Sequence, residues 1–317
     1  MRNIAACGIA FALAAFCITV PAAQSRFVAI TFDDLPYRSV GLAGAPLTRE
    51  AIESNRRILA ALTLHHVPVT GFVIETHVDL IGRSEGIEVL RQWVHRGLEL
   101  GNHTYSHADF DLLTAAEFKN EIVKGEATFA SVMRAAGKES RFFRFPMNHT
   151  GDTKAKHDEV AGFLAQRGYK LATCTIDTSD YLFNKAYAHA LARHDDAAAK
   201  KLSAEYLRYT DTEIDYYAAL NRKVLGYEPP EVMLLHDNRL NADVLEQVLR
   251  LFENKGYTFV TLEQAQLDPA YSAPETYITK YGPMWGYRWA AERGVKVNGR
   301  LETEVPQWVE AYAADQQ

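Results

Sequence analysis

The amino-acid sequence predicts an α/β fold built around a parallel sheet, either a (β/α) barrel or a doubly wound sheet. From residue 26 onward, short apolar runs rich in β-branched and aromatic residues alternate with helical patterns. These runs mostly lack the polar alternation of half-exposed strands, as expected of parallel strands that are buried on both faces. Seven runs fit an incomplete (β/α) barrel, and they are FVAITF (27–32), VTGFVI (69–74), LELGNH (98–103), RFFRFP (141–146), KLATCTI (170–176), EVMLLH (231–236) and YTFVTL (257–262).

Two of the intervening segments carry clear helix signals. Thr114 and Glu117 form a capping box at the start of a helix that we expect to reach about Ala136. Asn241 is the expected N-cap of the segment ADVLEQVLRLFENK, which Gly256 ends. Helices of this kind between strands are the crossovers that a parallel sheet needs.

Two regions fall outside the repeat. Residues 185–228 are rich in alanine and charge, and they predict a helical insertion between the fifth and sixth strands. Residues 265–317 form a C-terminal extension with four prolines and three of the four tryptophans. We expect its aromatic side chains to pack on the barrel, because large aromatics bury readily. A sugar-stacking surface is the alternative.

Composition and charge restrict the class of protein. With 317 residues, 48% hydrophobic and 23% charged, the chain is typical of a folded globular protein and not of a disordered, collagenous or coiled-coil one. Its net charge is −6, and it has no tract of Lys and Arg. Nucleic acid and an anionic membrane surface are therefore not expected partners.

The first 23 residues predict a secretory signal peptide. Arg2 precedes an uncharged stretch from Asn3 to Ser25 with an apolar centre, and small residues follow. An uncleaved membrane anchor is the alternative, although the apolar centre of about 17 residues is at the short limit for spanning a bilayer. Cleavage would leave Cys174 as the single cysteine, buried in the fifth strand. We expect a periplasmic or secreted protein with no stable membrane insertion.

Ionisable residues cluster at the carboxyl ends of the predicted strands, which meet at the same edge of a parallel sheet and commonly form active sites. The first strand ends in Asp33-Asp34, the third in His103 with His107, the fourth contains Arg144 and ends at Pro146, the fifth runs into Asp177 and Asp180, and the sixth ends in His236-Asp237.

The spacing of two of these histidines suggests a metal site. His103 and His107 are four residues apart, so on a helical turn both imidazoles would face one ion. One carboxylate would complete a three-ligand site with an open position, as in catalytic zinc sites. If one of the adjacent aspartates, Asp33 and Asp34, binds the metal, the other is free to accept a proton. Taken alone, the histidine pair could be incidental and the aspartates could serve as a helix cap or turn.

Five short motifs occur in order along the chain: Thr31-Phe32-Asp33-Asp34, His103-Thr104-Tyr105-Ser106-His107, Arg144-Phe145-Pro146, Asp177-Thr178-Ser179-Asp180-Tyr181 and Leu234-Leu235-His236-Asp237. Together they resemble the motifs of the polysaccharide deacetylase family, the family 4 carbohydrate esterases that share the NodB homology domain. The resemblance covers about residues 26–264. It implies a distorted (β/α) barrel with fewer than eight repeats, which agrees with the seven predicted strands.

The resemblance also implies a metal site and a base. Asp34, His103 and His107 would bind one divalent metal ion, with zinc as the expected ion. Asp33 would be the general base. Arg144 would pair with Asp33 and hold it ionised.

Other residues take their implied roles from the same motifs. His236 would be the general acid, and Asp180 would orient it and favour its protonated form. The backbone N–H of Met147, after Pro146, would help to stabilise the oxyanion. Pro146, Tyr181 and Leu234 would contribute to substrate binding.

Two positions depart from the usual family pattern. Met147 stands where an aromatic residue is common, and Tyr181 stands where tryptophan is common. The role of a backbone N–H survives any side chain, but the wall of the sugar groove would differ at Tyr181. His149 and Asp152 could be additional site groups, or the segment 150–152 could serve only as a turn and helix cap. The remaining histidines, such as His77, are expected at the surface or in loops.

The sequence therefore predicts a metal-dependent hydrolase that removes N-acetyl groups from a carbohydrate containing N-acetylglucosamine, such as peptidoglycan or chitin, and releases acetate. An O-acetyl esterase of the xylan type, a small-amide hydrolase and a catalytically silent carbohydrate-binding barrel are the alternatives. A glycosidase is disfavoured because Asp33 and Asp34 are adjacent, whereas glycosidase carboxylates flank the scissile bond. The oligomeric state stays open.

Overall fold

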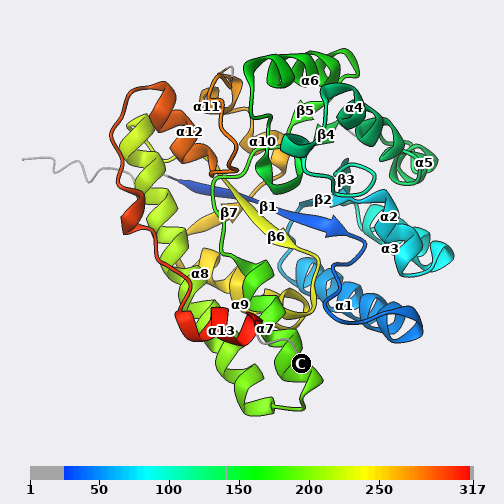
Figure 1. The fold of residues 1–317 in the computed structure, drawn as a ribbon. Coiled ribbons are helices and arrows are strands. Elements are labelled where there is room, and N and C mark those ends of the chain that lie inside the picture. The colour runs from blue at the N-terminus through cyan, green and yellow to red at the C-terminus, as the bar shows by residue number, and fades with distance from the viewer. Residues whose placement is uncertain (1–24, 140, 274, 315–317) are drawn as a thin grey trace, which may run out of the picture.

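A curled parallel sheet forms the centre of the molecule in the computed structural model, which describes residues 25–139, 141–273 and 275–314 (Figure 1). The sheet has seven strands in the order β5-β4-β3-β2-β1-β6, with β7 paired to β1. All strand pairs recorded among the described residues are parallel. The predicted α/β fold with an incomplete barrel is confirmed. The signal peptide expected at residues 1–23 lies outside the described residues.

Each strand coincides with one of the seven predicted apolar runs. Strand β1 is longer than its run because it continues through the two aspartates, β6 matches its run, and the other five strands are shorter than theirs. The strands are β1 (Arg26–Leu35), β2 (Val69–Val73), β3 (Glu99–Asn102), β4 (Phe142–Phe143), β5 (Lys170–Leu171), β6 (Glu231–His236) and β7 (Tyr257–Phe259).

The segment after β5 explains the curl of the sheet. Ala172 N donates a 2.8 Å hydrogen bond to Phe143 O, so the segment begins beside β4. Only four residues later Ile176 forms a parallel bridge with Met233 of β6, and Leu234 N donates to Ile176 O at 3.0 Å. The run 170–176 is therefore not one continuous strand, because it crosses from one edge of the sheet to the other.

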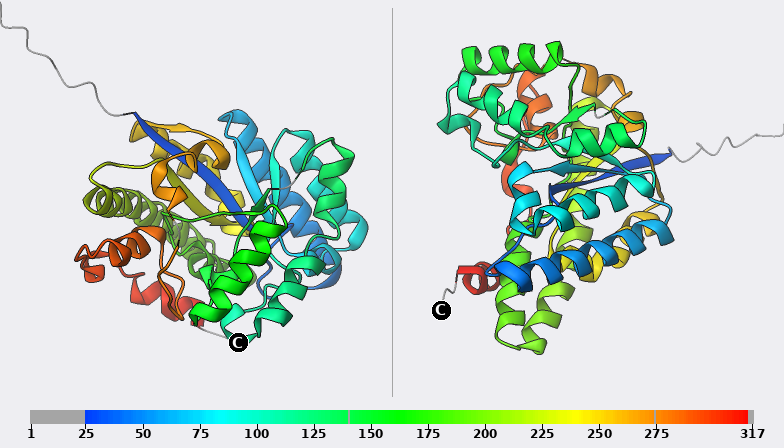
Figure 2. Two further views of the ribbon diagram at one scale, coloured as in Figure 1. Left: turned by 90° about the horizontal axis from the view of Figure 1, so that it is seen from above. Right: turned by 90° about the vertical axis from the view of Figure 1, so that its right-hand side faces the viewer.

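Helices surround the outside of the sheet (Figure 2). Helices α7 and α8 lie on the opposite side of the molecule from α4, α5 and α6 (Figures 1 and 2). The helices are α1 (Gly44–Leu64), α2 (Glu75–Leu80), α3 (Arg83–His95), η1 (Phe110–Leu112), α4 (Ala115–Lys124), α5 (Phe129–Ala135), η2 (Pro146–Asn148), α6 (Lys154–Gln166), α7 (Asp180–Ala192), α8 (Asp196–Leu225), α9 (Arg239–Asn254), α10 (Leu262–Ala265), α11 (Pro269–Ser272), α12 (Trp285–Glu292), η3 (Gly299–Leu301) and α13 (Gln307–Ala314).

The helix expected from Thr114 to about Ala136 is two helices. The capping box of Thr114 and Glu117 is present, but α4 ends at Lys124 and α5 begins at Phe129. The break follows Gly125, where a Cβ atom would lie 2.6 Å from the backbone carbon of Thr104. The chain approaches the loop after β3 too closely there for any residue other than glycine.

The expected cap of α9 is also corrected. Asn238 is the N-cap, and its side chain accepts a hydrogen bond from Asn241 N at 2.9 Å. The Asn241 amide points elsewhere, because it donates to a carboxylate oxygen of Asp180 and, at 2.8 Å, to His236 O. The Asn241 side chain therefore belongs to the hydrogen-bond network around Asp180 and His236 and does not cap the helix.

The insertion and the C-terminal extension pack together. Helices α7 and α8 lie between the segment after β5 and β6 in the chain, and α8 has 30 residues. Helix α12 packs on α8, and α13 packs on α7. Trp285 and Trp289 of α12 are buried in the main core. None of the helices in the described ranges has both the length and the apolar composition required to cross a bilayer.

A separate aromatic cluster lies under the loop that follows β4. Phe118 is fully buried, and its ring stacks on Phe110 and Phe145 at centroid distances of 5.6 Å or less. Phe145 directly precedes Pro146 at the site edge of the sheet. This cluster therefore supports the loops that carry candidate site residues.

We predict that Phe118→Ala lowers the free energy of unfolding by about 3–5 kcal/mol, since it deletes a fully buried ring and leaves a cavity. The control is Leu112→Ala, at a side chain that is 83% exposed, which should stay within about 0.5 kcal/mol of the parent chain. Urea denaturation followed by circular dichroism measures both. Equal transition midpoints for the two variants would contradict the assignment of Phe118 to the cooperative core.

Candidate metal centre and active site

An irregularity at the end of β1 places both aspartates at the site. Asp33 is in register with His236 of β6, but the register with β2 shifts between Phe32 and Leu35. Asp34 has a left-handed φ of 64°. In a regular strand two consecutive side chains point to opposite faces. Here the Asp33 and Asp34 carboxylates lie 3.6 and 3.7 Å from the same atom, His103 Nε2.

The two histidines lie on a loop and not on the expected helical turn. Residues 103–107 follow β3 without helical structure, and Thr104 and His107 have φ values of 73° and 58°. Thr104 Oγ1 accepts a 3.1 Å hydrogen bond from His107 N, and Asn102 Oδ1 accepts one from Thr104 N at 2.8 Å. These bonds fold the loop so that the two imidazole rings lie 5.0 Å apart.

Asp34, His103 and His107 form a buried group that could hold a metal ion. Asp34 Oδ1 lies 3.7 Å from His103 Nε2 and 3.5 Å from His107 Nε2. Ligands about 2.0–2.1 Å from a tetrahedral zinc ion are separated by roughly 3.4 Å, so the spacing fits.

The bonding around this group supports the same conclusion. Within the described chain, the buried Asp34 Oδ1 has no hydrogen-bond partner. His103 Nδ1 lies 2.9 Å from Arg144 O, which leaves Nε2 facing the carboxylates. Burial lowers the pKa of His107 to about 4, which favours the neutral imidazole that metals bind. The residues present therefore fit a divalent metal.

Arg144 holds Asp33 in place. The guanidinium is fully buried, and it donates hydrogen bonds to Asp33 Oδ1 at 2.8 Å and to Thr31 Oγ1 at 2.7 Å. It also donates to Thr173 O at 3.1 Å and stacks over the ring of Phe72. Because one carboxylate oxygen of Asp33 is used by Arg144, the other faces the histidines.

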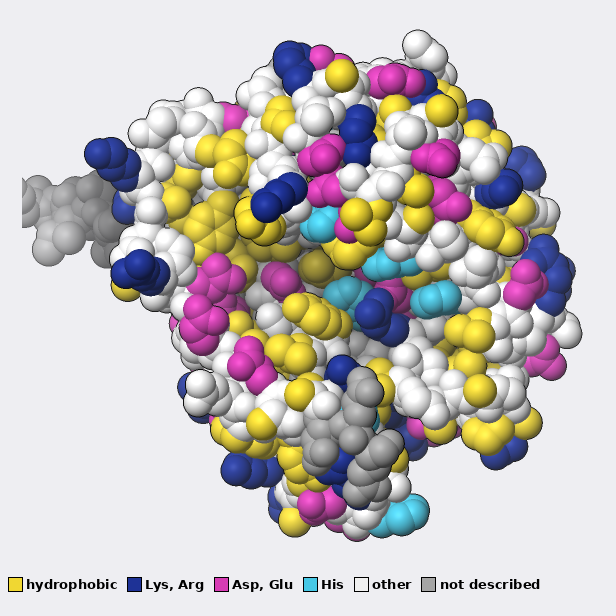
Figure 3. All heavy atoms as spheres, viewed as in Figure 1, with side chains coloured by type: hydrophobic (Ala, Val, Ile, Leu, Met, Phe, Trp, Pro, Cys, Tyr) yellow, Lys and Arg dark blue, Asp and Glu magenta, His cyan; other side chains and the backbone are white. Residues whose placement is uncertain are grey.

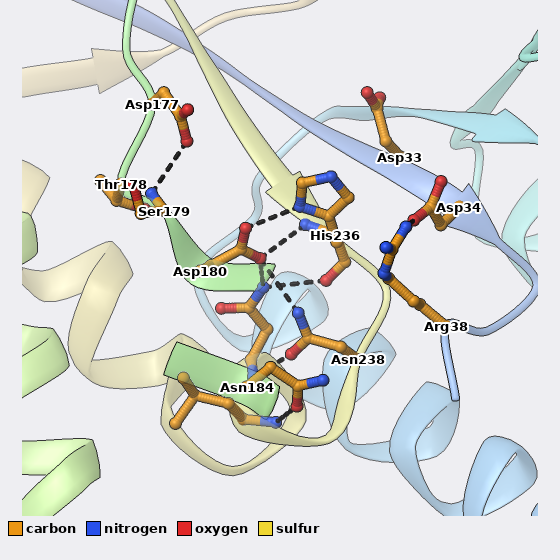
Figure 4. A network of polar contacts seen from close by, with 12 residues as sticks. Asp33, Asp34, Arg38, Asp177, Thr178, Ser179, Asp180, Asn184, His236 and Asn238 are labelled. Carbon is orange, nitrogen blue, oxygen red and sulfur yellow. Dashed lines mark hydrogen bonds and ion pairs between the residues drawn. The ribbon is translucent and has the colours of Figure 1, made fainter. Parts of the chain in front are cut away.

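His236 is held by Asp180 at the start of α7. His236 Nδ1 lies 2.6 Å from Asp180 Oδ1, and His236 N donates to Asp180 Oδ2 at 2.8 Å. Figure 4 shows the imidazole between Asp180 and the aspartate pair that ends β1. Burial by itself would lower the pKa of His236, but the charge and hydrogen bond of Asp180, together with the charges of Asp34 and Asp33, outweigh burial and raise it to about 9. The ring is therefore protonated near neutral pH.

Met147 lies in η2, directly after the fourth strand. Met147 and Asn148 have left-handed φ values of 55° and 54°. The first N–H groups of such a short helix have no partner within the helix, so they can bind a ligand. The Met147 side chain is 44% exposed.

A cavity of about 490 Å³ joins these groups. Figure 3 shows this face, where histidine, acidic and basic side chains gather around a hollow flanked by apolar side chains. Pro146 is buried and is not among the lining residues. The lining residues are Asp33, Arg38, His103, His107, Met147, Asn148, Asp177, Tyr181, Leu234, His236, Gly282 and Met284.

Comparison with known proteins agrees with this geometry. The family model for polysaccharide deacetylases matches residues 21–166, which contain the aspartate pair, both histidines of the loop and Arg144. The chain belongs to the polysaccharide deacetylase family. The family contains N-deacetylases and also pseudoenzymes, so membership alone leaves the reaction open.

Several relatives of this polysaccharide deacetylase family member have names that indicate their activity. A peptidoglycan-N-acetylglucosamine deacetylase of Bacillus cereus is 23% identical over 241 residues, which cover 74% of this chain and 66% of the relative. A bifunctional xylanase/deacetylase of Pseudobutyrivibrio xylanivorans is 22% identical over 244 residues, which cover 76% of this chain and 30% of the relative. The chain thus spans less than two thirds of either relative.

Solved structures show the same fold. The polysaccharide deacetylase Bc1974 from Bacillus cereus has a TM-score of 0.51 at 21% identity, with 74% of this chain and 91% of that chain covered. A mutant of BA3943, a CE4 family pseudoenzyme, has a TM-score of 0.50 at 18% identity, with 77% and 68% covered.

The structure adds site residues that the sequence analysis missed. Arg38 forms an ion pair with Asp34 Oδ2, so it occupies the oxygen that does not face the histidines. His77 is expected at the surface or in a loop, but it lies in α2 and its Nδ1 is 3.2 Å from Asp34 O. Asp177, which the sequence analysis places after the fifth strand without a role, lines the cavity, and burial raises its pKa to about 6. The position of Arg38 four residues after Asp34 was a signal, although a weak one.

The two candidate additional groups lie outside the cavity. His149 Nδ1 is 2.8 Å from Asp109 Oδ1 and 3.5 Å from Asp111 Oδ2, which gives a separate polar cluster. Asp152 pairs with Lys156 at 2.9 Å. The expected cap role of residues 150–152 is wrong, because Thr153 is the N-cap of α6 and accepts a hydrogen bond from Lys156 N. Asp152 lies in the bend before this helix.

We predict that Asp34→Ala weakens zinc binding by more than about 100-fold, because even the loss of an outer-shell partner costs ~10–100-fold. Asp33→Asn is the matched control, since its amide oxygen can still accept from Arg144 and the group of three is intact. Equilibrium dialysis with metal analysis measures both variants. Stoichiometric zinc in Asp34→Ala at the affinity of the parent protein would disprove this metal centre.

Proposed function

We propose that the protein is a zinc-dependent hydrolase that removes N-acetyl groups from poly- or oligosaccharides containing N-acetylglucosamine and releases acetate. The observation that carries the proposal is the convergence, in one cavity, of a metal-binding group, a carboxylate held by Arg144 and a protonated His236. Names among the relatives support it, including a chitooligosaccharide deacetylase of Bradyrhizobium that is 35% identical over 74 residues.

Hydrolysis would begin at Asp33. Its Oδ2 lies 3.6 Å from His103 Nε2, at the edge of the metal-binding group, so it can accept the proton of an attacking water. A divalent ion held by Asp34, His103 and His107 would polarise the acetyl carbonyl and lower the pKa of that water. Arg144 holds the Asp33 carboxylate at the correct place and balances its charge.

Collapse of the tetrahedral intermediate would depend on Met147 and His236. The Met147 N–H, at the start of η2, can donate to the oxyanion, and one such donor contributes about 3–4 kcal/mol in comparable sites. His236 can then give its proton to the departing amine, which cannot leave as an anion. Asp180 keeps the imidazole ring in position and charged before that step.

A catalytically silent binding barrel is less consistent with the site. The residues proposed as base, acid and metal ligands are all present, Arg144 pairs with Asp33, and Asp180 pairs with His236. An O-acetyl esterase would use the same groups but would need His236 less, because an alcohol is a better leaving group than an amine. These alternatives are separated by the experiment below.

We also propose how the chain is divided and where it acts. Residues 1–23 would be a cleaved signal peptide, residues 26–264 the deacetylase domain with its insertion at about 185–228, and residues 265–317 a C-terminal extension that packs on the barrel. The charged start and apolar centre of the first segment support export to the periplasm or the medium.

The reaction is tested by measuring acetate release from N-acetylglucosamine oligomers, peptidoglycan and acetylated xylan. We expect release from an N-acetylated substrate, loss of release with a chelator and recovery with zinc. Asp33→Asn should retain zinc yet lose turnover by about 10²–10⁴-fold, as expected for loss of a general base. Release from xylan alone would favour the esterase, and no release from zinc-loaded protein would refute deacetylation of these polymers.

The state of His236 predicts the alkaline limb of the pH profile. Because Asp180 raises the pKa of His236 to about 9, the acid form is present below that pH and kcat/KM should fall as the pH rises through about 9. Asp180→Asn should move this limb down by at least about one unit, since an ion-pair partner changes a pKa by about 1–3 units. Asp158→Asn, at a half-exposed side chain on α6, is the control. An unchanged limb in Asp180→Asn would exclude His236 as the acid.

A further inference from the structure

The C-terminal extension reaches the edge of the active-site cavity. Gly282 and Met284 line the cavity together with Met147 and Asn148. Both extension residues come after Asp237, the last residue of the five motifs. A part of the chain beyond these motifs is therefore in contact with the loop expected to bind the oxyanion.

Gly282 lies directly against the backbone of Met147. A Cβ atom at this glycine would be 1.8 Å from Met147 O and 3.1 Å from Asn148 Cβ. Met147 and Asn148 both have left-handed φ values. Asparagine adopts this conformation readily, but for methionine it is unfavourable and persists only where the surroundings enforce it. The extension is one of those surroundings.

Arg288 of α12 connects the extension to the same loop. Its guanidinium is fully buried and donates to Asn148 O at 2.6 Å, to Thr150 Oγ1 at 3.0 Å and to Pro283 O at 3.1 Å. Glu275 balances its charge in an ion pair. One rigid guanidinium therefore binds the loop after β4 on one side and the extension on the other.

Two further contacts hold these parts to the barrel. Trp285 N donates to Cys174 O at 2.9 Å, and Cys174 Sγ lies 3.7 Å from Asn148 Oδ1. His157 of α6 contacts Thr150 O and Glu275 O, each at 3.1 Å. The loop that contains Met147 is thus enclosed by the extension, α6 and the segment after β5.

We propose that Gly282 and Arg288 are positioning residues that hold η2 so that the Met147 N–H faces the cavity, and that residues 282–284 form one wall of the substrate site. The inference rests on the proposed function. Burying a charged guanidinium is costly, and an apolar side chain would serve packing alone at least as well. What an apolar side chain cannot do is bind the carbonyl of Asn148 and the hydroxyl of Thr150 together.

The first test compares Gly282→Ala with Gly162→Ala. The control site on α6 has open space around an added Cβ, so the same substitution there is harmless. We expect Gly282→Ala to lower kcat by about 100-fold, as small displacements of catalytic groups do. Zinc content should match that of the parent protein. The thermal midpoint should fall, because the added Cβ displaces the backbone of Met147, and KM should change by less than about tenfold.

The second test examines Arg288 without leaving an unpaired buried charge. The double variant Arg288→Met with Glu275→Gln roughly keeps the side-chain volumes but removes the hydrogen bonds from position 288 to Asn148 O and Thr150 Oγ1. For the double variant we expect a loss of kcat similar to that of Gly282→Ala. Hydrogen exchange of the backbone amides at 147–149 should become faster, and exchange in β1 should stay unchanged. Arg288→Lys keeps the positive charge but lacks the planar guanidinium with its several N–H donors, so it should retain more activity than the double variant.

The outcomes separate the two proposals. Parental kcat and parental exchange at 147–149 in Gly282→Ala and in the double variant would overturn the positioning role while the deacetylase function stands. If the parent protein releases no acetate from any substrate, the proposed function fails, and the exchange rates at 147–149 alone decide whether the extension holds the loop.

Discussion

A buried positive charge organises the site end of the barrel. The Arg144 guanidinium has no contact with solvent, so its charge must be balanced and its N–H groups must be bonded within the protein. Asp33 and Thr31 of β1 supply two acceptors, Thr173 after β5 supplies a third, and the ring of Phe72 in β2 covers one face. The carbonyl of Arg144 orients His103. Strands β1, β2 and β4, the loop after β3 and the segment after β5 are thus tied to one side chain, which cannot move without exposing an unpaired charge.

The same constraint separates the tasks of the two adjacent aspartates. Arg144 takes one oxygen of Asp33, and Arg38 pairs with one oxygen of Asp34. The register shift in β1 turns the remaining oxygens toward His103. On the other side of the cavity, Asp180 keeps His236 protonated. A carboxylate paired with Arg144 and an imidazole paired with Asp180 therefore lie on neighbouring strands, which is the arrangement that a base and an acid require.

The C-terminal extension gives the site a boundary that the barrel alone lacks. Its contacts go to backbone groups of the loop after β4, through Gly282 at Met147 and Arg288 at Asn148. Gly282 and Met284 of the extension line the cavity, whereas the metal-binding group and His236 lie on the five sequence motifs.

Much of this molecule could be predicted from the sequence. The seven strands and the convergence of Asp33, His103, Arg144 and His236 follow from apolar runs with polar ends, because parallel strands align their carboxyl ends at one edge. What only the tertiary structure decided depends on contacts between residues far apart in the chain. Such contacts decide the conformation of the loop that contains His107 and the break at Gly125. They also decide that the Asn241 side chain donates to Asp180 and does not cap α9. The placement of Gly282 against Met147 does so most clearly, because no local pattern records which surface a distant segment will cover.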